Sequence, residues 1–258
     1  MDLKGKRIVV TGASSGIGQA FARRLARAGA RVVGVSRNPE EIKSSLGDLG
    51  VQAIGCDVSD PAQVDVMLRE AEELLGGIDV FVSNAGFAYY GTIGPPDWEK
   101  NEKIFKTNVF APIYILQKLA LRRTEPLTFM VTISALGKMV LPGFSLYNAT
   151  KFAMDGFVRT YRMEKPKNIK IVPVYPVATL KTRFFKKAND DTPIPLPPQP
   201  VSIVAYCMEQ GLRLGFRSVY TSIVFLVRCL LVRVLPVDLI PQAIERIRFN
   251  IWRKKHNK

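Results

Sequence analysis

The chain has 258 residues, of which 47% are hydrophobic and 23% are charged, which is long enough and balanced enough for one globular domain with a substantial core. Its formal net charge is +15, and residues 201–258 contain ten Lys and Arg but only three Asp and Glu. This excess favours an anionic partner such as a membrane surface, with solubility as the alternative. Nucleic acid is not expected, because the basic residues alternate with large aliphatic ones.

The single histidine, His256, excludes a Ser-His-Asp triad, and three widely spaced cysteines predict neither a disulfide framework nor a metal site. A general base must therefore be Tyr, Lys, Asp or Glu. Charged residues from Asp2 to Arg7 lead directly into the first apolar run, so no signal peptide is expected. The sequence predicts a cytoplasmic protein that is not secreted.

Apolar runs alternate with segments of helical period from the start of the chain. The expected strands are 8–10, 32–35, 51–56, 78–82, 127–133, 169–175 and 217–221. The expected helices are 17–28, 40–49, 60–75, 97–123 with a break near Pro112, 144–163 and 201–214. This alternation predicts an α/β fold, a Rossmann-type doubly wound parallel sheet of about seven strands with helices on both faces.

A glycine-rich turn, from Thr11 to Gly18, joins the first expected strand to the first helix. Gly12 permits a sharp turn, Gly16 lets the backbone approach a pyrophosphate, and Gly18 lets the helix pack near the sheet. The free N–H groups and dipole of the helix favour an anion there. The turn predicts a dinucleotide phosphate site, although an ordinary loop is the alternative; its candidate residues are Gly12, Ser14, Ser15, Gly16, Ile17 and Gly18.

Other candidate residues follow the later strands at the edge where such sheets bind ligands. They are Arg37, Asp57, Asn84, Ser134 and Pro176. Beyond them, Tyr147 and Lys151 are four residues apart on an expected helix and share one face. A phenol titrates near pKa ~10 and a neighbouring ammonium lowers that value. Tyr147 is thus a candidate general acid and base for a substrate oxygen that Ser134 orients. The alternative is that Tyr147 and Lys151 are ordinary surface residues.

These motifs, from about residue 5 to residue 182, resemble the classical short-chain dehydrogenase/reductase family. The matching residues are Thr11-Gly12-x-x-x-Gly16-x-Gly18, Asp57-Val58, Asn84-Ala85-Gly86, Asn108, Ser134 and Tyr147-x-x-x-Lys151. The resemblance implies a catalytic tetrad of Asn108, Ser134, Tyr147 and Lys151. It also implies that the cofactor carries the hydride and that Lys151 binds the nicotinamide ribose. Asn108 would hold a water molecule in a proton relay that reaches Lys151.

The same resemblance implies that Asp57 and Val58 contact adenine and that Asn84, Ala85 and Gly86 line the cofactor. It implies a homodimer or homotetramer as well. Three alternatives stay open: Asn108 as a structural polar contact, Asp57 as a turn residue and Ser134 as a strand-end cap.

The chain departs from the family after the sixth strand. Val177 follows Pro176 where a glycine is usual, and Thr182 lies six residues beyond the proline instead of five. Thr179 occupies the place whose backbone usually meets the carboxamide. We therefore expect Pro176, Thr179 and Thr182 at the nicotinamide end of the cofactor.

The end of the second strand carries Ser36-Arg37 where an acidic residue would bind a ribose 2′-hydroxyl. A guanidinium suits a 2′-phosphate, so NADP(H) is predicted over NAD(H), with a merely solvated Arg37 as the alternative. Residues 1–258 then form a single NAD(P)-binding Rossmann domain, with a substrate-loop region at 189–221 and a basic amphipathic helical extension at 222–258.

Residues 222–235 are apolar but contain Arg228 and Arg233, and Pro236 ends the run before it can span a bilayer. The extension is expected either as a peripheral, interfacial membrane helix or as a core or dimer-contact helix that covers the substrate pocket. Trp252 and the terminal lysines favour the membrane.

Aromatic and aliphatic residues flank the expected site, which predicts an apolar substrate such as a lipid, steroid or retinoid-like ketone. They are Phe87, Tyr89, Tyr90, Met139, Leu141, Phe144, Phe184 and Phe185. The leading hypothesis is an NADP(H)-dependent oxidoreductase that interconverts a carbonyl and a secondary alcohol. The alternatives are a non-catalytic dinucleotide-binding sensor and a membrane-surface scaffold.

Overall fold

The computed structural model describes residues 1–121, 125–180, 184, 188, 192, 194–195, 197–231, 247–252 and 254. Its centre is a sheet of seven strands in the order β3-β2-β1-β4-β5-β6-β9, and every neighbouring pair is parallel. The strands are β1 (Arg7–Thr11), β2 (Arg31–Ser36), β3 (Gln52–Gly55), β4 (Val80–Ser83), β5 (Leu127–Thr132), β6 (Ile169–Tyr175) and β9 (Val219–Tyr220). The predicted doubly wound parallel sheet is confirmed.

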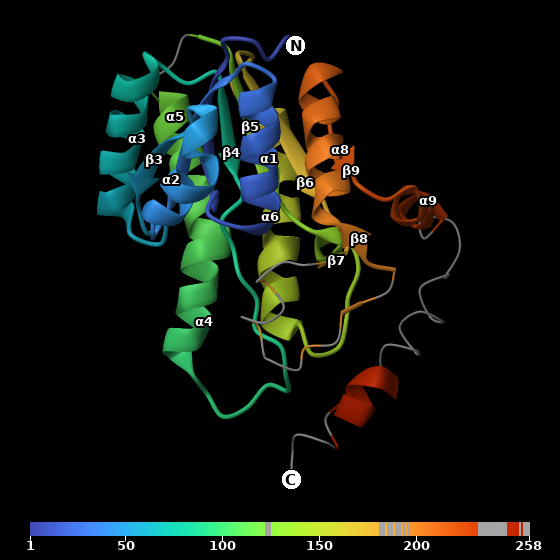
Figure 1. Ribbon diagram of the computed structural model, residues 1–258. Helices are drawn as coiled ribbons and strands as arrows, with labels where there is room; N and C mark the ends of the chain where they lie inside the picture. Colours follow the sequence, from blue (N-terminus) through green and yellow to red (C-terminus); the bar gives the residue numbers. More distant parts are fainter. Residues whose placement is uncertain are drawn as a thin grey trace.

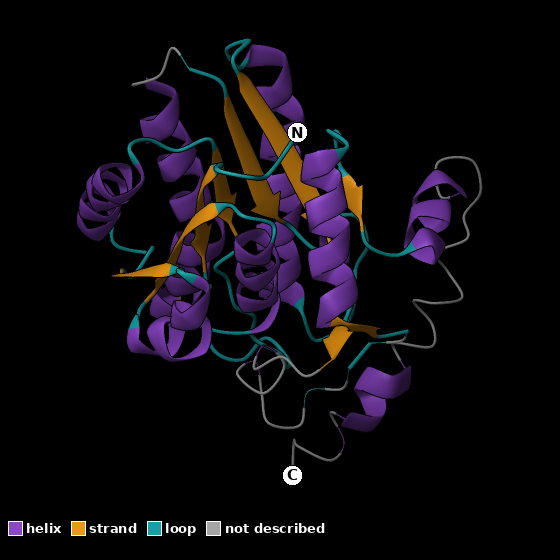
Figure 2. Cartoon of the chain, turned by 45° about the horizontal axis from the view of Figure 1, so that its top comes forward, coloured by secondary structure: helices purple, strands orange, loops and turns teal. Residues whose placement is uncertain are grey.

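Helices cover both faces of the sheet, as Figure 1 and Figure 2 show. They are α1 (Gly16–Arg27), α2 (Glu40–Leu46), α3 (Pro61–Leu75), α4 (Trp98–Phe105), α5 (Ala111–Leu121), α6 (Ser145–Glu164), α8 (Val201–Arg213) and α9 (Ile223–Leu231). Side chains of α1, α2 and α8 share one core with Val10 and Val82. Those of α3, α5 and α6 share the other core with Val9 and Phe81. Because both faces are buried, the strands are continuous apolar runs.

The helix expected over 97–123 is divided by a π-helical turn, Lys106–Phe110. Pro112 is the second residue of α5 and follows the π-helical turn within one continuous helical run, where it has no N–H to bond to the preceding turn. The break therefore falls around Asn108, slightly before the proline. Single π-turns inside helices are frequent at functional sites.

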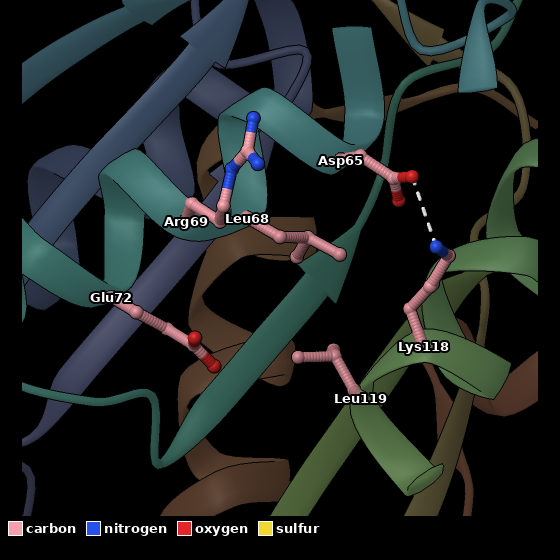
Figure 3. A pocket seen from close by; sticks show the side chains of 6 residues that line it. All are labelled: Asp65, Leu68, Arg69, Glu72, Lys118 and Leu119. Atoms are coloured by element: carbon pink, nitrogen blue, oxygen red, sulfur yellow. Dashed lines mark hydrogen bonds and ion pairs between the residues drawn. The ribbon is translucent and has the colours of Figure 1, made fainter. Parts of the chain in front are cut away.

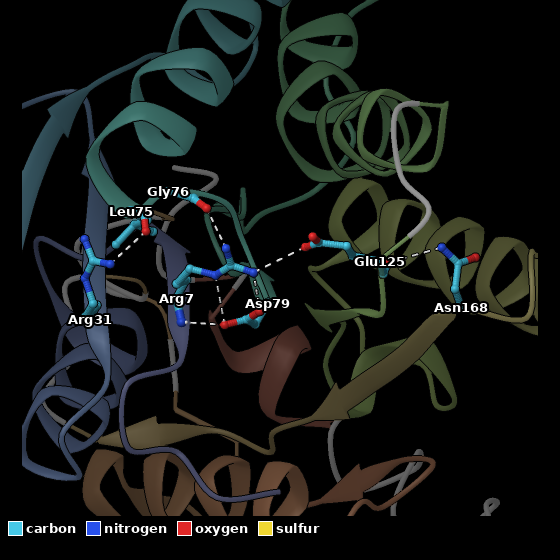
Figure 4. A network of polar contacts seen from close by, with 7 residues as sticks. All are labelled: Arg7, Arg31, Leu75, Gly76, Asp79, Glu125 and Asn168. Atoms are coloured by element: carbon cyan, nitrogen blue, oxygen red, sulfur yellow. Dashed lines mark hydrogen bonds and ion pairs between the residues drawn. The ribbon is translucent and has the colours of Figure 1, made fainter.

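Arg7 ties strand β1 to β4 at the amino end of the sheet (Figure 4). Its guanidinium lies 2.8 Å from Asp79 Oδ1, and its backbone N–H donates to Asp79 Oδ2 at 2.9 Å. The guanidinium also donates to Gly76 O at the end of α3. This network lies at the edge opposite the glycine turn, so it holds the scaffold and leaves the carboxyl edge open to ligands.

Two short strands, β7 (Thr179–Leu180) and β8 (Gln199–Pro200), form a small parallel sheet of their own. Within the substrate-loop region expected at 189–221, Gln199–Pro200 is therefore a strand. The pairing holds the chain after β6 against the start of α8. In that region, residues 189–191, 193 and 196 lie outside the described residues.

Candidate functional site

The glycine turn is shaped by close backbone approaches. Gly12 and Gly16 have φ values of +68° and +57°, which favour glycine. A Cβ on Gly18 would lie 2.3 Å from Gly12 O and 2.6 Å from Asn84 Nδ2. A side chain at Gly18 would thus push the turn away from Asn84, and the turn and the end of β4 form one unit.

The amino end of α1 opens at this turn. Ser15 is the N-cap, and its side chain makes no capping bond within the described chain. The first turn of the helix carries no acidic residue. The N–H groups here fit the pyrophosphate of a dinucleotide, since they have no intrahelical partners and the helix dipole favours an anion.

Thr11, Asn84 and Thr132 lock the carboxyl ends of β1, β4 and β5 together. Thr11 Oγ1 accepts bonds from the N–H groups of Asn84 at 2.9 Å and Ala85 at 3.0 Å. Asn84 Nδ2 donates to Thr11 O, and Thr132 Oγ1 donates to Asn84 Oδ1, each at 3.1 Å. Sequence reasoning missed the role of Thr132, because it depends on which strands are neighbours.

The structure brings Ser134, Tyr147 and Lys151 together beside that lock. The Lys151 ammonium lies 5.4 Å from the centroid of the Tyr147 ring, and it donates to Thr132 O at 3.1 Å. The hydroxyls of Ser134 and Tyr147 are hydrogen-bonded. A continuous path of contacts therefore leads from the glycine turn through Asn84 and Thr132 to Lys151.

Ser134 holds this position in a strained backbone conformation, with φ at +142°. Its Oγ also accepts the N–H of Leu136 at 3.1 Å, which starts a 3₁₀ turn over Ala135–Gly137. The expected capping function and the contact with Tyr147 thus coexist in one side chain. Backbone strain of this kind is concentrated at functional sites.

Burial dominates the titration of the pair. It raises the pKa of Tyr147 above its usual range, although the hydrogen bond with Ser134 acts in the opposite direction. Burial also lowers the pKa of Lys151 to about 8. Burial of both groups thus opposes the effect that the sequence predicts, and the lowering of the phenol's pKa by Lys151 stays a prediction.

Asn108 lies in the π-helical turn with its side-chain amide fully engaged. Its Oδ1 accepts the N–H of Phe87 at 3.1 Å, and its Nδ2 donates to Phe87 O at 2.9 Å and Thr150 Oγ1 at 3.1 Å. A Cβ on Gly86 would lie 3.1 Å from Asn108 Oδ1 and 3.7 Å from Lys151 Nζ. Asn108 thus fixes the chain after β4 beside Lys151; a water relay through it stays a prediction.

Thr150 and Asn148 are further residues that sequence reasoning missed. Thr150 Oγ1 donates to Tyr147 O at 2.7 Å, so it links Asn108 to the backbone of the tyrosine. Asn148 Nδ2 donates to the carbonyls of Leu136 and Met139 at 2.8 Å, which holds the loop after Ser134. Both lie within the segment that carries Tyr147 and Lys151, but only their partners reveal their roles.

The predicted adenine end lies at the carboxyl ends of β2 and β3. Arg37 is exposed, while Ser36 Oγ donates to Asn38 O at 2.7 Å. Asp57 Oδ1 accepts the N–H and hydroxyl of Ser59 at 2.9 and 2.7 Å. Asp57 therefore stabilises the turn after β3, which is the alternative that the sequence left open. Val58 packs into the core. Adenine contacts by Asp57 and Val58 stay predictions.

The predicted nicotinamide end is only partly described. Pro176 O accepts the N–H of Ala135 at 2.8 Å, which places it beside Ser134. Thr179 is buried, and its hydroxyl donates to Val177 O at 2.9 Å. Thr182 lies outside the described residues.

An aromatic cluster surrounds Tyr147. Its ring centroid lies 5.3 Å from that of Phe184 and 6.2 Å from that of Phe144. Tyr90 extends the cluster, at 4.8 Å from Phe144 and 4.9 Å from Trp252. The other apolar residues that the sequence suggested here are also members, namely Phe87, Tyr89, Met139 and Leu141, whereas Phe185 lies outside the described residues.

The C-terminal helical residues 247–252 therefore pack on the cluster that contains the candidate catalytic tyrosine. Phe249 stacks on Trp252 at 5.9 Å and lies 6.1 Å from Tyr90. Arg248 donates to Ile194 O at 3.2 Å. The packing of Trp252 on Tyr90 agrees with the alternative in which the extension covers the substrate pocket, and membrane contact of this segment stays a prediction.

A small hollow of about 70 Å³ lies between α3 and α5 (Figure 3). Lys118 pairs with Asp65 across it at 2.9 Å. None of its lining residues is a predicted site residue, so we assign it to helix packing.

Known proteins with similar sequences and structures match this arrangement. A family model described as short chain dehydrogenase matches residues 6–193. The 3-ketodihydrosphingosine reductase of Bos taurus is 31% identical over 74% of this chain and 61% of its own length. Dehydrogenase/reductase SDR family member 7B of Mus musculus is 30% identical over 67% and 58%. The chain thus spans about three fifths of these relatives.

Solved structures agree in fold. A 3-ketoacyl-(acyl-carrier-protein) reductase from Brucella melitensis, complexed with NADH, has a TM-score of 0.75 and 25% identity, covering 84% of this chain and 97% of its own. A short-chain dehydrogenase from Sphingobium yanoikuyae, in complex with NADPH, has a TM-score of 0.75 and 26% identity, covering 84% and 88%. With its seven-stranded Rossmann-type sheet and the family match over most of its length, the chain belongs to the classical short-chain dehydrogenase/reductase family.

Proposed function

We propose that this protein is an NADP(H)-dependent oxidoreductase that interconverts a carbonyl and a secondary alcohol on an apolar, lipid-like substrate. The observation that carries the proposal is the joining of Tyr147, Ser134 and Lys151 to the glycine turn through Thr132 and Asn84. A protein that only binds a dinucleotide has no need of a buried phenol held by a serine hydroxyl.

Each residue of the site has its own role in a carbonyl reduction. When bound, NADPH supplies the hydride to the carbonyl carbon. Tyr147 donates its phenolic proton to the carbonyl oxygen, and Ser134 holds that oxygen by a hydrogen bond. Lys151, when charged, stabilises the phenolate that forms, because the ammonium lies against the phenol ring in a buried site. In alcohol oxidation the proton moves from the alcohol to Tyr147.

Arg37 supports NADP(H) as the cofactor. Its side chain is exposed at the carboxyl end of β2, beside the turn that fits the pyrophosphate. A guanidinium there binds a 2′-phosphate with charge-assisted hydrogen bonds.

The aromatic cluster supports an apolar substrate. A substrate oxygen that reaches Tyr147 must bring its carbon skeleton among Phe184, Phe144 and Tyr90. Relatives named as 3-ketodihydrosphingosine reductases favour a long-chain keto lipid over a small polar ketone.

The protein is proposed to act at the cytoplasmic surface of a membrane. The helix α9 supports this with an apolar face that is open to solvent. Among the described helices, none combines the length and hydrophobicity needed to cross a bilayer. We therefore propose peripheral contact.

Steady-state NADPH oxidation over a panel of carbonyl compounds tests the proposal. We expect turnover with long-chain ketones, and Tyr147→Phe should lower kcat by about 1,000-fold while NADPH still binds, because only proton donation is lost. Tyr206→Phe is the matched control, since Tyr206 lies half-exposed on α8. NADPH binding by the wild type without turnover of any carbonyl would instead favour the dinucleotide-sensor function.

A further inference from the structure

Asp155 is a buried carboxylate on α6, four residues beyond Lys151, and it is 6% exposed. It accepts the hydroxyl of Tyr175 at 2.6 Å, and the ammonium of Lys138 lies 3.0 Å from one of its oxygens and 3.2 Å from the other. Lys138 Nζ also lies 4.8 Å from the centroid of the Tyr175 ring. A carboxylate is buried at a cost in hydration that its partners must offset, and the roles assigned above leave this one without a function.

The partners of Asp155 belong to two other elements beside the site. Lys138 directly follows the 3₁₀ turn Ala135–Gly137, which begins at Ser134. Tyr175 is the last residue of β6. The carboxylate therefore links α6 both to the carboxyl end of β6 and to the loop that carries Ser134.

This loop is packed closely between β6 and α6. The N–H of Ala135 donates to Pro176 O at 2.8 Å, and the N–H of Lys138 donates to Ala135 O at 2.9 Å. A Cβ on Gly137 would lie 2.9 Å from Lys151 O. The ion pair with Asp155 thus anchors the far end of a short, tightly held loop.

Ser134 needs such an anchor because of its backbone conformation. Its φ of +142° is one that L residues rarely adopt, and a strained backbone persists only where the surrounding structure holds it. In this conformation its Oγ accepts the N–H of Leu136 at 3.1 Å and its hydroxyl meets that of Tyr147. A loop released from α6 would let Ser134 relax and lose Tyr147.

We propose that Asp155 is a positioning residue, which holds the Ser134 hydroxyl on Tyr147 by anchoring the loop through Lys138. Its catalytic consequence rests on the proposed function, whereas the contact between the two hydroxyls is measurable without turnover. Asp155 acts through Lys138 and Ser134 and takes no proton from the substrate.

Several other charged or titratable groups face Asp155 or the hollow of about 370 Å³ that it lines between α6 and α9. Together with its two partners they are Lys138, Arg159, Arg162, Tyr175, Tyr220 and Arg228. Arg159 lies 3.9 Å from the carboxylate, with a side chain that is 70% exposed. Among these six, Lys138 is the one on the loop after Ser134, so Asp155 and Lys138 carry the link and Arg159 does not.

Carbon-13 NMR of protein labelled at the tyrosine Cζ tests the link without turnover. The Tyr147 signal is the one that Tyr147→Phe removes, and Ser134→Ala gives its position without the serine hydroxyl. Asp155→Asn keeps an acceptor for Tyr175 but loses the ion pair. We expect it to move the Tyr147 signal by more than half of the Ser134→Ala shift, and Lys138→Met to do the same from the other end of the pair.

Two matched controls separate the link from general destabilisation. Arg159→Gln removes an exposed partner of the same carboxylate. Glu209→Gln removes another buried, ion-paired carboxylate, which lies 2.6 Å from Arg24 on the far side of the sheet. Neither should move the Tyr147 signal, and melting temperatures verify that each variant is folded. An unmoved signal in Lys138→Met, or an equal shift in Glu209→Gln, would overturn the inference.

Kinetics test the catalytic consequence. Asp155→Asn should lower kcat for carbonyl reduction about tenfold and leave KM for NADPH within twofold, because the serine is displaced and the cofactor site is not. In alcohol oxidation the pH midpoint of kcat should rise by about half a unit. Burial raises the pKa of Tyr147 and the hydrogen bond with Ser134 opposes that rise, so its loss leaves the phenol harder to deprotonate.

The two kinds of measurement fail separately. An unchanged pH midpoint in Asp155→Asn would overturn the catalytic consequence of the link. A wild type that reduces no carbonyl compound would contradict the proposed function, and the NMR shift would still decide whether Asp155 positions Ser134.

Discussion

Lys151 lies in an environment that differs strongly from what its side chain prefers in water. It is 5% exposed, and the contacts that receive its ammonium are a backbone carbonyl and a phenol ring. Burial of an amine shifts its pKa and costs folding free energy, and such shifted groups are concentrated at functional sites. The same desolvation acts on Tyr147, so burial favours the neutral form of each group.

The pKa of Lys151 makes a prediction for stability. The folded pKa is about 8 and the ordinary value is 10.5, so between these values the unfolded chain binds more protons. The contribution of Lys151 to the free energy of unfolding therefore rises with pH in this window, by at most about 1.4 kcal/mol per pH unit. Urea unfolding at pH 7, 8, 9 and 10 should show the wild type gaining stability relative to Lys151→Met. A constant difference across these values would contradict the burial of a titrating amine.

Arg37 makes a second prediction at this scale. Arg37→Asp should lower the ratio of kcat/KM with NADPH to kcat/KM with NADH by about 100-fold, because a charge-assisted bond to the 2′-phosphate is replaced by repulsion. Arg27→Asp, on an exposed face of α1, is the control for charge alone. An unchanged ratio in Arg37→Asp would show that the guanidinium is merely solvated.

Among the elements, the glycine turn and the π-helical turn place the site by different means. The glycine turn depends on the absence of side chains, since a Cβ on Gly18 has no room beside Gly12 O. The π-helical turn depends on one side chain, Asn108, which bonds both backbone groups of Phe87. Together they fix the backbone at the carboxyl edge of the sheet, where the cofactor is proposed to bind.

Gly18→Ala tests the packing of the glycine turn. We expect the free energy of unfolding to fall by about 2 kcal/mol, because the new methyl group forces the turn away from Asn84. NADPH affinity should fall as well. Gly47→Ala is the matched control, since a Cβ there meets nothing within 4 Å. Equal stability of the two variants by urea unfolding would argue against the tight contact.

For the molecule as a whole, the chain returns at its end to the site built by its first 180 residues. Phe249 and Trp252 pack on Tyr90, which leads through Phe144 to Tyr147. Tyr147 is 7% exposed under this aromatic cover. A substrate must therefore displace part of the cluster to reach the phenol.

Tryptophan fluorescence can detect that displacement. In a Trp98→Phe variant, Trp252 is the remaining tryptophan. We expect 1-dodecanol to shift its emission to longer wavelength, because an alkyl chain entering the cluster moves the ring toward water. In the converse Trp252→Phe variant the emission comes from Trp98, which is 80% exposed, and should not shift. An identical response from both variants would exclude opening at the C-terminal helix.

The sequence by itself determined the fold, because apolar runs and helical periods are local patterns and parallel strands buried on both faces leave few other arrangements. It also determined the candidates along the carboxyl edge, since the glycine turn and the Tyr147-x-x-x-Lys151 spacing are short-range signals. Only the tertiary structure decided which of these groups are buried, and burial raises the pKa of the Tyr147 phenol.

Tertiary structure also decided what covers the site. Trp252 and Tyr90 are separated by more than 160 positions in the chain, and no local pattern encodes their contact. The links through Thr132, Thr150 and Asn148 were hidden for the same reason. A side chain's partner depends on the whole fold, whereas its helix or strand depends mostly on its neighbours in sequence.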